Sequence, residues 1–182
     1  MKYLFLVIIF ISFTSKVSAS FKNDIIQNLQ NTQNLSFNFE QNINGELENG
    51  DCVIEYPKKI FCKYDLKNKK ILVSNGRSLV IKTNTSYYIY SIEKTPLNLI
   101  LDKEFLINKI KVLEERYVGN NFINFKFSEN DIEINVFFDK KTHNLIGWQT
   151  KDIYQNLSIT YLFSITKNRS IKNNLFKLPK QN

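Results

Sequence analysis

The sequence predicts a mainly β fold with short helices, in which an unclosed antiparallel β-barrel is covered by a helical lid. Strand patterns with short connections fill residues 34–92 and 110–163, which is typical of one large antiparallel sheet. A single helical stretch, residues 95–107, interrupts them. The segments 71–73 and 79–81 are apolar on both faces, although few helices are expected to cover them. A half-barrel around an apolar cavity accounts for these observations.

Two successive β-hairpins form the centre of the predicted sheet. If the first turn lies at Pro57, Cys52 lies opposite Cys62. Side chains alternate between the faces of a strand. The side chains that then share one face are Cys52, Ile54, Tyr56, Ile60, Cys62 and Tyr64. The second hairpin turns at Asn75-Gly76 between two apolar runs, which is the strongest short hairpin signal in a sequence.

The two cysteines have two possible states. In an exported chain, Cys52 and Cys62 can form a disulfide, and closing so short a loop stabilises a fold by about 2–3 kcal/mol. The alternative is a pair of reduced, buried thiols that pack as small hydrophobic groups. A metal site is not expected, because one histidine and scattered carboxylates lack the spacing of metal ligands.

The first 19 residues have the pattern of a signal peptide. Lys2 precedes an apolar run at residues 3–13, which is shorter than the roughly 20 residues of a membrane-spanning helix. Small residues then predict cleavage after Ala19. The alternative is an uncleaved N-terminal anchor. We expect a signal peptide over 1–19 and a single domain over 20–182.

The remaining elements follow from periodicity. An amphipathic helix is expected at 21–31 and a strand at 34–42. Asn44-Gly45 and Asn49-Gly50 predict turns on either side of a short strand. A strand at 86–92 follows the central hairpins. Turns of the second strand region are expected at 119–121, 129–131 and 139–144.

The helical stretch at 95–107 is expected to consist of two short helices. Thr95 and Pro96 are typical of the cap and first position of a helix, and Asp102 is a candidate cap for the next one.

Catalysis has no support in the sequence. His143 lies in a charged turn, and no neighbouring motif supplies a nucleophile or an orienting carboxylate. Phosphate-binding, dinucleotide-binding and hydrolase motifs are missing from the sequence. The formal net charge is +8, but the lysines are scattered, which favours a solvated surface over a nucleic-acid site. We expect neither an enzyme nor a cofactor.

Six motifs succeed one another along the predicted mature chain: Phe39-x-Gln41, a strand ending at Tyr56-Pro57, Phe61-x-x-Tyr64, ILVSNGRSL at 71–79, TPLNLIL at 95–101, and Phe176-x-x-Pro179. Their order and spacing resemble the periplasmic outer-membrane lipoprotein carrier family, LolA. The resemblance implies an unclosed barrel with a helical lid, whose cavity shields lipoprotein acyl chains in the periplasm. It also implies a monomer that works with acylated lipoproteins, an inner-membrane ABC transporter that releases them, and an outer-membrane acceptor such as LolB.

The face pattern and the resemblance together give a candidate lipid site. The cavity residues are Ile54, Tyr56, Ile60 and Tyr64, and the lid residues are Leu97, Ile100 and Leu101. The inward face of residues 79–81 stays open. The family usually has an arginine before the proline, which latches the lid. Tyr56 stands there, and our hypothesis is that it lines the cavity and latches the lid more weakly, so that Tyr56→Phe loosens it.

Two other function classes remain open at this point. One is a periplasmic binding module for another lipid or apolar small molecule. The other is a sensor or interaction protein of the same fold, which binds a protein partner.

Overall fold

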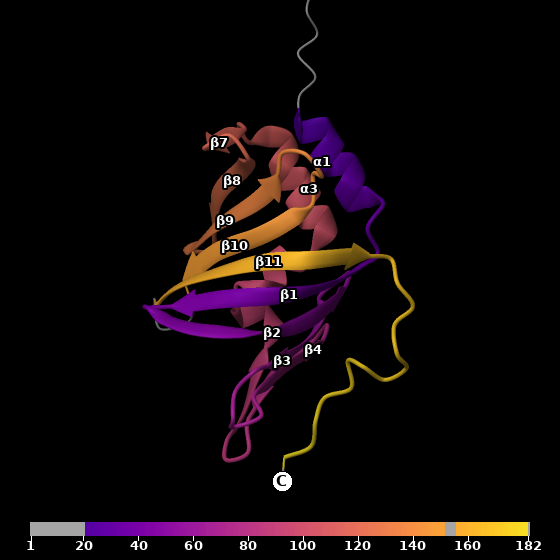
Figure 1. The fold of residues 1–182 in the computed structure, drawn as a ribbon, viewed down its shortest axis with the longest axis vertical. Helices are drawn as coiled ribbons and strands as arrows, with labels where there is room; N and C mark the ends of the chain where they lie inside the picture. The colour runs from indigo at the N-terminus through magenta and orange to yellow at the C-terminus, as the bar shows by residue number, and fades with distance from the viewer. Residues whose placement is uncertain (1–20, 152–155, 182) are drawn as a thin grey trace, which may run out of the picture.

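The computed structural model describes residues 21–151 and 156–181, and within them it contains one antiparallel sheet with short helices against one side (Figure 1). The predicted signal peptide at 1–19 lies outside the described residues. The strands are β1 (Asn34–Ile43), β2 (Glu46–Glu55), β3 (Lys59–Tyr64), β4 (Ile71–Asn75), β5 (Ser78–Lys82), β6 (Tyr87–Ser91), β7 (Arg116–Val118), β8 (Phe122–Glu129), β9 (Ile132–Asp139), β10 (Leu145–Lys151) and β11 (Leu157–Lys167). The helices are α1 (Phe21–Gln30), a 3-10 turn (Ile92–Lys94), α2 (Leu97–Ile100) and α3 (Lys103–Val112).

The sheet has 11 strands in the order β6-β5-β4-β3-β2-β1-β11-β10-β9-β8-β7. β6 and β7 stand at its two edges, so the sheet curves without closing into a barrel. This agrees with the predicted fold class. Every neighbouring pair except β1–β11 is also consecutive in the chain, as expected for hairpins with short turns. The β1–β11 ladder joins the two halves of the chain into one sheet (Figure 1).

The first central hairpin has the predicted register. Cys52 pairs with Cys62, Ile54 pairs with Ile60, and the two cysteines are linked by a disulfide. In the second hairpin Gly76 has a φ of +94°. The side chain of Asn75 accepts hydrogen bonds from the backbone amides of residues 77 and 78. Both turns therefore follow from local sequence.

The helices α1 and α3 pack on one half of the sheet. Ile25 of α1 and Ile110 of α3 are fully buried together with Phe125 and Phe138 of the β8–β9 hairpin. On the other half, β1–β6, the cover consists of the 3-10 turn and the four-residue helix α2. The concave face of that half is therefore covered by fewer apolar side chains.

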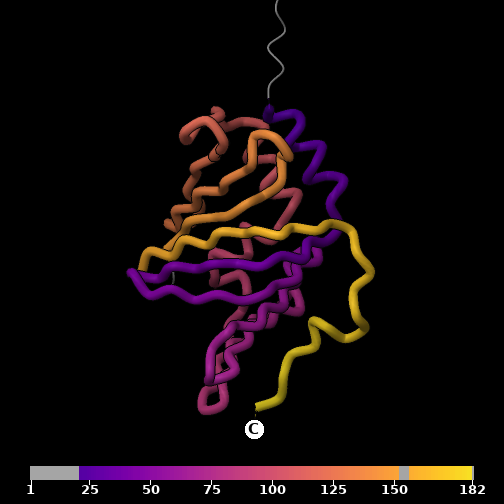
Figure 2. The backbone as a smooth tube through the Cα atoms, viewed as in Figure 1, coloured from indigo at the N-terminus to yellow at the C-terminus, as the bar shows by residue number. Residues whose placement is uncertain are grey.

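The C-terminal segment after β11 turns back beside the sheet (Figure 2). Its residues 171–177 border a hollow together with Glu55, Lys59 and Asn75, whose side chains lie on the face of the sheet opposite the covered one. The hydroxyl of Tyr87 donates to the backbone oxygen of Pro179, and the ammonium of Lys59 lies 5.8 Å from the ring centre of Phe176. Val80, which faces this side, is fully buried. The segment thus covers one of the two apolar faces that the sequence left without a cover.

Two predicted boundaries are wrong. The predicted turn at Asn49-Gly50 lies inside β2, where Gly50 pairs with Phe39 and Tyr64. The predicted return to strands at residue 110 is also wrong, because α3 extends to Val112 and strands resume at Arg116. Burial of Ile110 against the sheet stabilises this last helical turn.

Gly50 is needed for packing and not for a turn. A Cβ atom at this position would lie 2.1 Å from the backbone oxygen of Lys63 and 2.9 Å from the ring of Phe39. The ring of Phe39 occupies that space and packs edge-on against Tyr64, with ring centres 5.0 Å apart.

We therefore predict that Gly50→Ala lowers the free energy of unfolding by about 1–3 kcal/mol, because the added methyl group forces β2 and β3 apart. Urea denaturation measures the change. The matched control is Asn49→Ala at the neighbouring exposed position, for which we expect a change within about 0.5 kcal/mol. Equal midpoints for the two variants would contradict this account.

Candidate functional site

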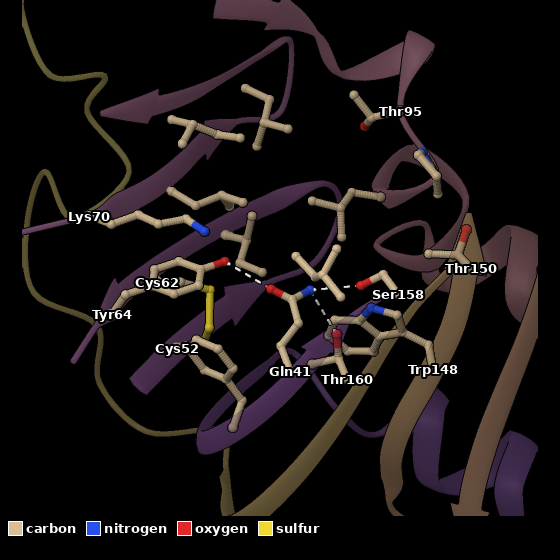
Figure 3. A pocket seen from close by; sticks show the side chains of 18 of the residues that line it. Gln41, Cys52, Cys62, Tyr64, Lys70, Thr95, Trp148, Thr150, Ser158 and Thr160 are labelled. Atoms are coloured by element: carbon tan, nitrogen blue, oxygen red, sulfur yellow. Dashed lines mark hydrogen bonds between the residues drawn. A yellow bond between two sulfur atoms is a disulfide. The ribbon is translucent and has the colours of Figure 1, made fainter. Parts of the chain in front are cut away.

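A cavity of about 260 Å³ lies between the concave face of β1–β6 and the segment that leads into α2 (Figure 3). Strands β10 and β11 complete its wall. Most of its lining is apolar. The apolar residues are Phe37, Phe39, Ile43, Cys52, Ile60, Cys62, Leu72, Leu79, Ile81, Tyr90, Pro96, Leu97 and Trp148. The polar residues are Gln41, Tyr64, Lys70, Thr95, Thr150, Ser158 and Thr160.

The Cys52–Cys62 disulfide forms part of this wall (Figure 3). Both cysteines are buried, and no free cysteine is present in the described part of the chain. The bridge joins β2 to β3 directly beneath the cavity. It therefore holds the two strands together at a place where packing against a helix is missing.

A polar network crosses the wall from β1 to β11. The amide nitrogen of Gln41 donates to the hydroxyl oxygens of Ser158 and Thr160, each at 3.1 Å. The amide oxygen of Gln41 accepts a 3.4 Å hydrogen bond from the hydroxyl of Tyr64 (Figure 3). The Gln41 side chain is therefore held by hydrogen bonds at both ends of its amide group.

Lys70 and Tyr64 extend the network to the end of β3 and the residue before β4. The ammonium of Lys70 lies 2.6 Å from Glu48 and 4.2 Å from the centre of the Tyr64 ring. Burial, and secondarily the charge of Glu48, raises the pKa of the Tyr64 phenol above its ordinary value. Tyr64 is therefore a neutral hydrogen-bond donor throughout the physiological range.

The structure brings three of the seven predicted lipid-site residues to the cavity. Ile60, Tyr64 and Leu97 lie in its lining. The other four lie outside it and belong to the apolar core or pack against it: Ile54, Tyr56, Ile100 and Leu101. For residues 79–81, whose inward face the sequence left open, Leu79 and Ile81 line the cavity.

Sequence reasoning missed the polar part of the wall. Gln41 interrupts an alternating stripe of inward-facing apolar residues on β1, between Phe39 and Ile43, and Ser158 and Thr160 alternate in the same way on β11. A polar residue at an inward position of such a stripe was the available signal. For Trp148, no pattern in the sequence indicated a position in the cavity wall.

The lid is fastened at the first hairpin turn, but not by a hydrogen bond from the Tyr56 hydroxyl. The Tyr56 hydroxyl is buried and has no hydrogen-bond partner among the described residues. Instead the backbone amide of Lys58 donates to the backbone oxygen of Leu101 at 2.9 Å. The ammonium of Lys58 lies 3.4 Å from Asp102, whose carboxylate also accepts from the amide of Phe105 at the start of α3. This corrects the hypothesis of a tyrosine latch.

The described part of the chain holds neither a group of three potential metal ligands nor a helix long and apolar enough to cross a membrane. An apolar cavity under a short helical cover defines a protein that encloses an apolar ligand or an apolar part of one.

Residues 30–179 match the model of the family described as outer membrane lipoprotein carrier protein LolA. The chain therefore belongs to the LolA family, as the resemblance predicted. This is a family of carrier and binding proteins, not of enzymes, and it implies a protein that works outside the cytoplasm.

Several solved structures are similar to this chain at low sequence identity, and one of them, from Thermus thermophilus, shares its fold. An uncharacterized conserved protein from Thermus thermophilus has a TM-score of 0.51 at 7% identity, covering 90% of this chain and 95% of that one. A LolA superfamily protein from Nitrosomonas europaea has a TM-score of 0.45 at 6% identity, with coverage of 86% and 97%. The lipoprotein LppX from Mycobacterium tuberculosis has a TM-score of 0.40 at 8% identity, with coverage of 83% and 96%. Among curated proteins, none matches.

The position of Tyr56 gives a prediction opposite to that of a tyrosine latch. Tyr56→Phe removes a buried hydroxyl without a partner, so we expect the free energy of unfolding to stay the same or rise by about 1 kcal/mol. Amide hydrogen exchange at residues 97–101 should be unchanged. Faster exchange at these residues would instead support the hypothesis that the Tyr56 hydroxyl latches the lid.

Asp102 should matter more for the lid than Tyr56 does. Asp102→Ala removes both the cap of α3 and the ion pair, and should cost about 1 kcal/mol and speed exchange of the Phe105 amide. Lys58→Ala, the control, loses only a partly exposed ion pair and should cost less than about 0.5 kcal/mol. Similar effects of both variants would mean that the ion pair, not the cap, holds the lid.

Proposed function

We propose that this protein is a periplasmic carrier that takes up lipoproteins released from the inner membrane and delivers them to the outer membrane. In this proposal the predicted segment 1–19 directs export. An ABC transporter supplies the cargo, and a LolB-like acceptor receives it. The observation that carries the proposal is the apolar cavity beneath a short lid, in a chain that belongs to the LolA family.

The physical need for such a carrier is large. Each CH₂ group that leaves water contributes about 0.8 kcal/mol, so a lipoprotein with long acyl chains cannot cross an aqueous compartment unassisted. Ile60, Tyr64 and Leu97 offer apolar surface to the first part of such a chain. Ile54, Tyr56, Ile100 and Leu101 lie next to this surface and would contact a chain only after the lid moves.

Release is equally required of a carrier. The cavity volume of about 260 Å³ is just below the roughly 300–1,000 Å³ of pockets that enclose drug-sized ligands, so a diacylated group has to push the lid outward. The fastening at Lys58 consists of one backbone hydrogen bond and one partly exposed ion pair. Interactions of this kind contribute about 1 kcal/mol each. Most of the resistance to opening therefore comes from the burial of Ile100 and Leu101, and an acyl chain that enters beneath the lid replaces the apolar contacts that these side chains lose.

The direct test is mass spectrometry of the protein purified gently from the periplasm of the cells that produce it. Co-purifying acylated lipoproteins in stoichiometric amount would support the proposal. Free fatty acid or glycolipid alone would favour a general lipid-binding module. Capture of a regulatory protein without any lipid would favour a sensor of the same fold.

Binding in the cavity can be followed with the protein's own fluorescence. Trp148 is the single tryptophan of the chain and lies in the lining. A synthetic lipopeptide with brominated acyl chains should quench it, whereas the same peptide without acyl chains should not. Ile81→Glu places a carboxylate against the acyl chain and should weaken binding about tenfold or more.

The matched control is Ile89→Glu on the adjacent strand. Ile89 is 57% exposed and lies outside the cavity lining, so this variant should bind like the wild type. Equal loss of binding in both variants, or no loss in either, would place the acyl chains outside this cavity.

A further inference from the structure

The hydroxyl groups of the cavity wall fall into two kinds. The hydroxyl of Thr95 donates to the backbone oxygen of Ile92 at 2.8 Å, and that of Thr150 donates to the backbone oxygen of Lys151 at 3.2 Å. These two groups have their hydrogen atoms engaged by the protein. Ser158 and Thr160 differ, because their oxygen atoms accept from Gln41.

The two accepting hydroxyls keep a hydrogen atom to donate. Both are bound by the same amide nitrogen of Gln41, and its oxygen is turned away from them toward Tyr64. No acceptor for either hydroxyl hydrogen occurs among the described residues. Ser158 is 7% exposed and Thr160 is 4% exposed, so bulk water reaches them poorly. A buried donor without an acceptor is costly, and here both donors line the cavity.

The charges of the wall limit what the acceptor can be. The lining contains no aspartate or glutamate, and its one charged residue, Lys70, is paired with Glu48 at 2.6 Å. An anionic group at Ser158 and Thr160 would therefore lack a free counter-charge and would experience the field of Glu48. A neutral acceptor with an apolar body suits this wall better than a carboxylate or a phosphate.

We propose that Ser158 and Thr160 donate hydrogen bonds to the carbonyl oxygens of ester-linked acyl chains, and that the cavity thereby selects acyl esters over plain hydrocarbon. Gln41 is a positioning residue, since it fixes where the two hydroxyl hydrogens point. This inference rests on the proposed function and adds to it the chemical group that the polar part of the wall recognises. Acyl carbonyls lie where the chains join their glycerol, so the site also sets how deeply the chains enter.

The test compares two synthetic lipopeptides with identical peptides and chain lengths. One carries two ester-linked acyl chains on an S-glyceryl cysteine, and the other carries ether-linked alkyl chains, which lack the carbonyl oxygens. Titration followed by Trp148 fluorescence gives the two dissociation constants. Two neutral hydrogen bonds predict that the wild-type protein binds the ester at least about fivefold more tightly.

Substitutions of the two hydroxyl residues test whether they cause the preference for the ester over the ether. In Ser158→Ala/Thr160→Val the ester-to-ether ratio should fall to about one. The matched control is Thr166→Val on the same strand, whose hydroxyl donates to the backbone oxygen of Ser36 outside the cavity, and which should keep the wild-type ratio. If the double variant fails to fold, the ester-to-ether comparison on the wild-type protein decides alone.

The outcomes distinguish a failure of the ester subsite from a failure of the carrier proposal. Equal affinity of the wild type for ester and ether overturns the subsite and leaves the carrier proposal standing. Failure of both lipopeptides to bind overturns the carrier proposal and the subsite with it. Tighter binding of a free fatty acid than of the ester would show that the site takes an anion, which also overturns the inference.

Discussion

The backbone ladder between β1 and β11 is the interaction on which the rest of the structure depends. All other strand pairs join neighbours in the sequence, so without this ladder the chain would form two separate meanders. Its register sets Gln41 opposite Thr160, and it therefore builds the polar wall of the cavity as well as the sheet. Gly147 serves the same junction, because a Cβ atom there would lie 2.5 Å from the backbone oxygen of Thr160.

The cavity exists because the helical cover is unequal. Helices α1 and α3 fill the concave side of β8–β10 with buried aliphatic side chains, and that half is an ordinary core. The half formed by β1–β6 has only the four-residue α2 and a 3-10 turn. So short a cover closes the mouth without filling the interior. Phe37, Leu72 and Leu79 therefore border space where another helix would otherwise pack.

Much of the hairpin architecture could be predicted because it is local. Asn75-Gly76 fixes a turn, and the alternation from Cys52 to Tyr64 fixes one face and one register. Which side chains of that face line the cavity depends on contacts with residues distant in the chain, and could not be predicted from the hairpin alone. Ile54 and Ile60 are cross-strand partners on the same face, but only Ile60 lines the cavity, whereas Ile54 is fully buried in the core. The turn predicted at Gly50 was wrong for the same reason, because glycine is required there by the ring of Phe39 on the neighbouring strand.

The sequence by itself determined the fold class, the faces of the first central hairpin, the central register and the family. Those features depend on periodicity, turn residues and motif order, which are properties of neighbouring residues. Tertiary structure decided the site. Gln41 is more than 110 residues away from Ser158 and Thr160 in the chain and meets them only through the β1–β11 ladder. The fastening of the lid was also decided there, because the amide of Lys58 finds the carbonyl of Leu101 only once α2 has folded back over the sheet.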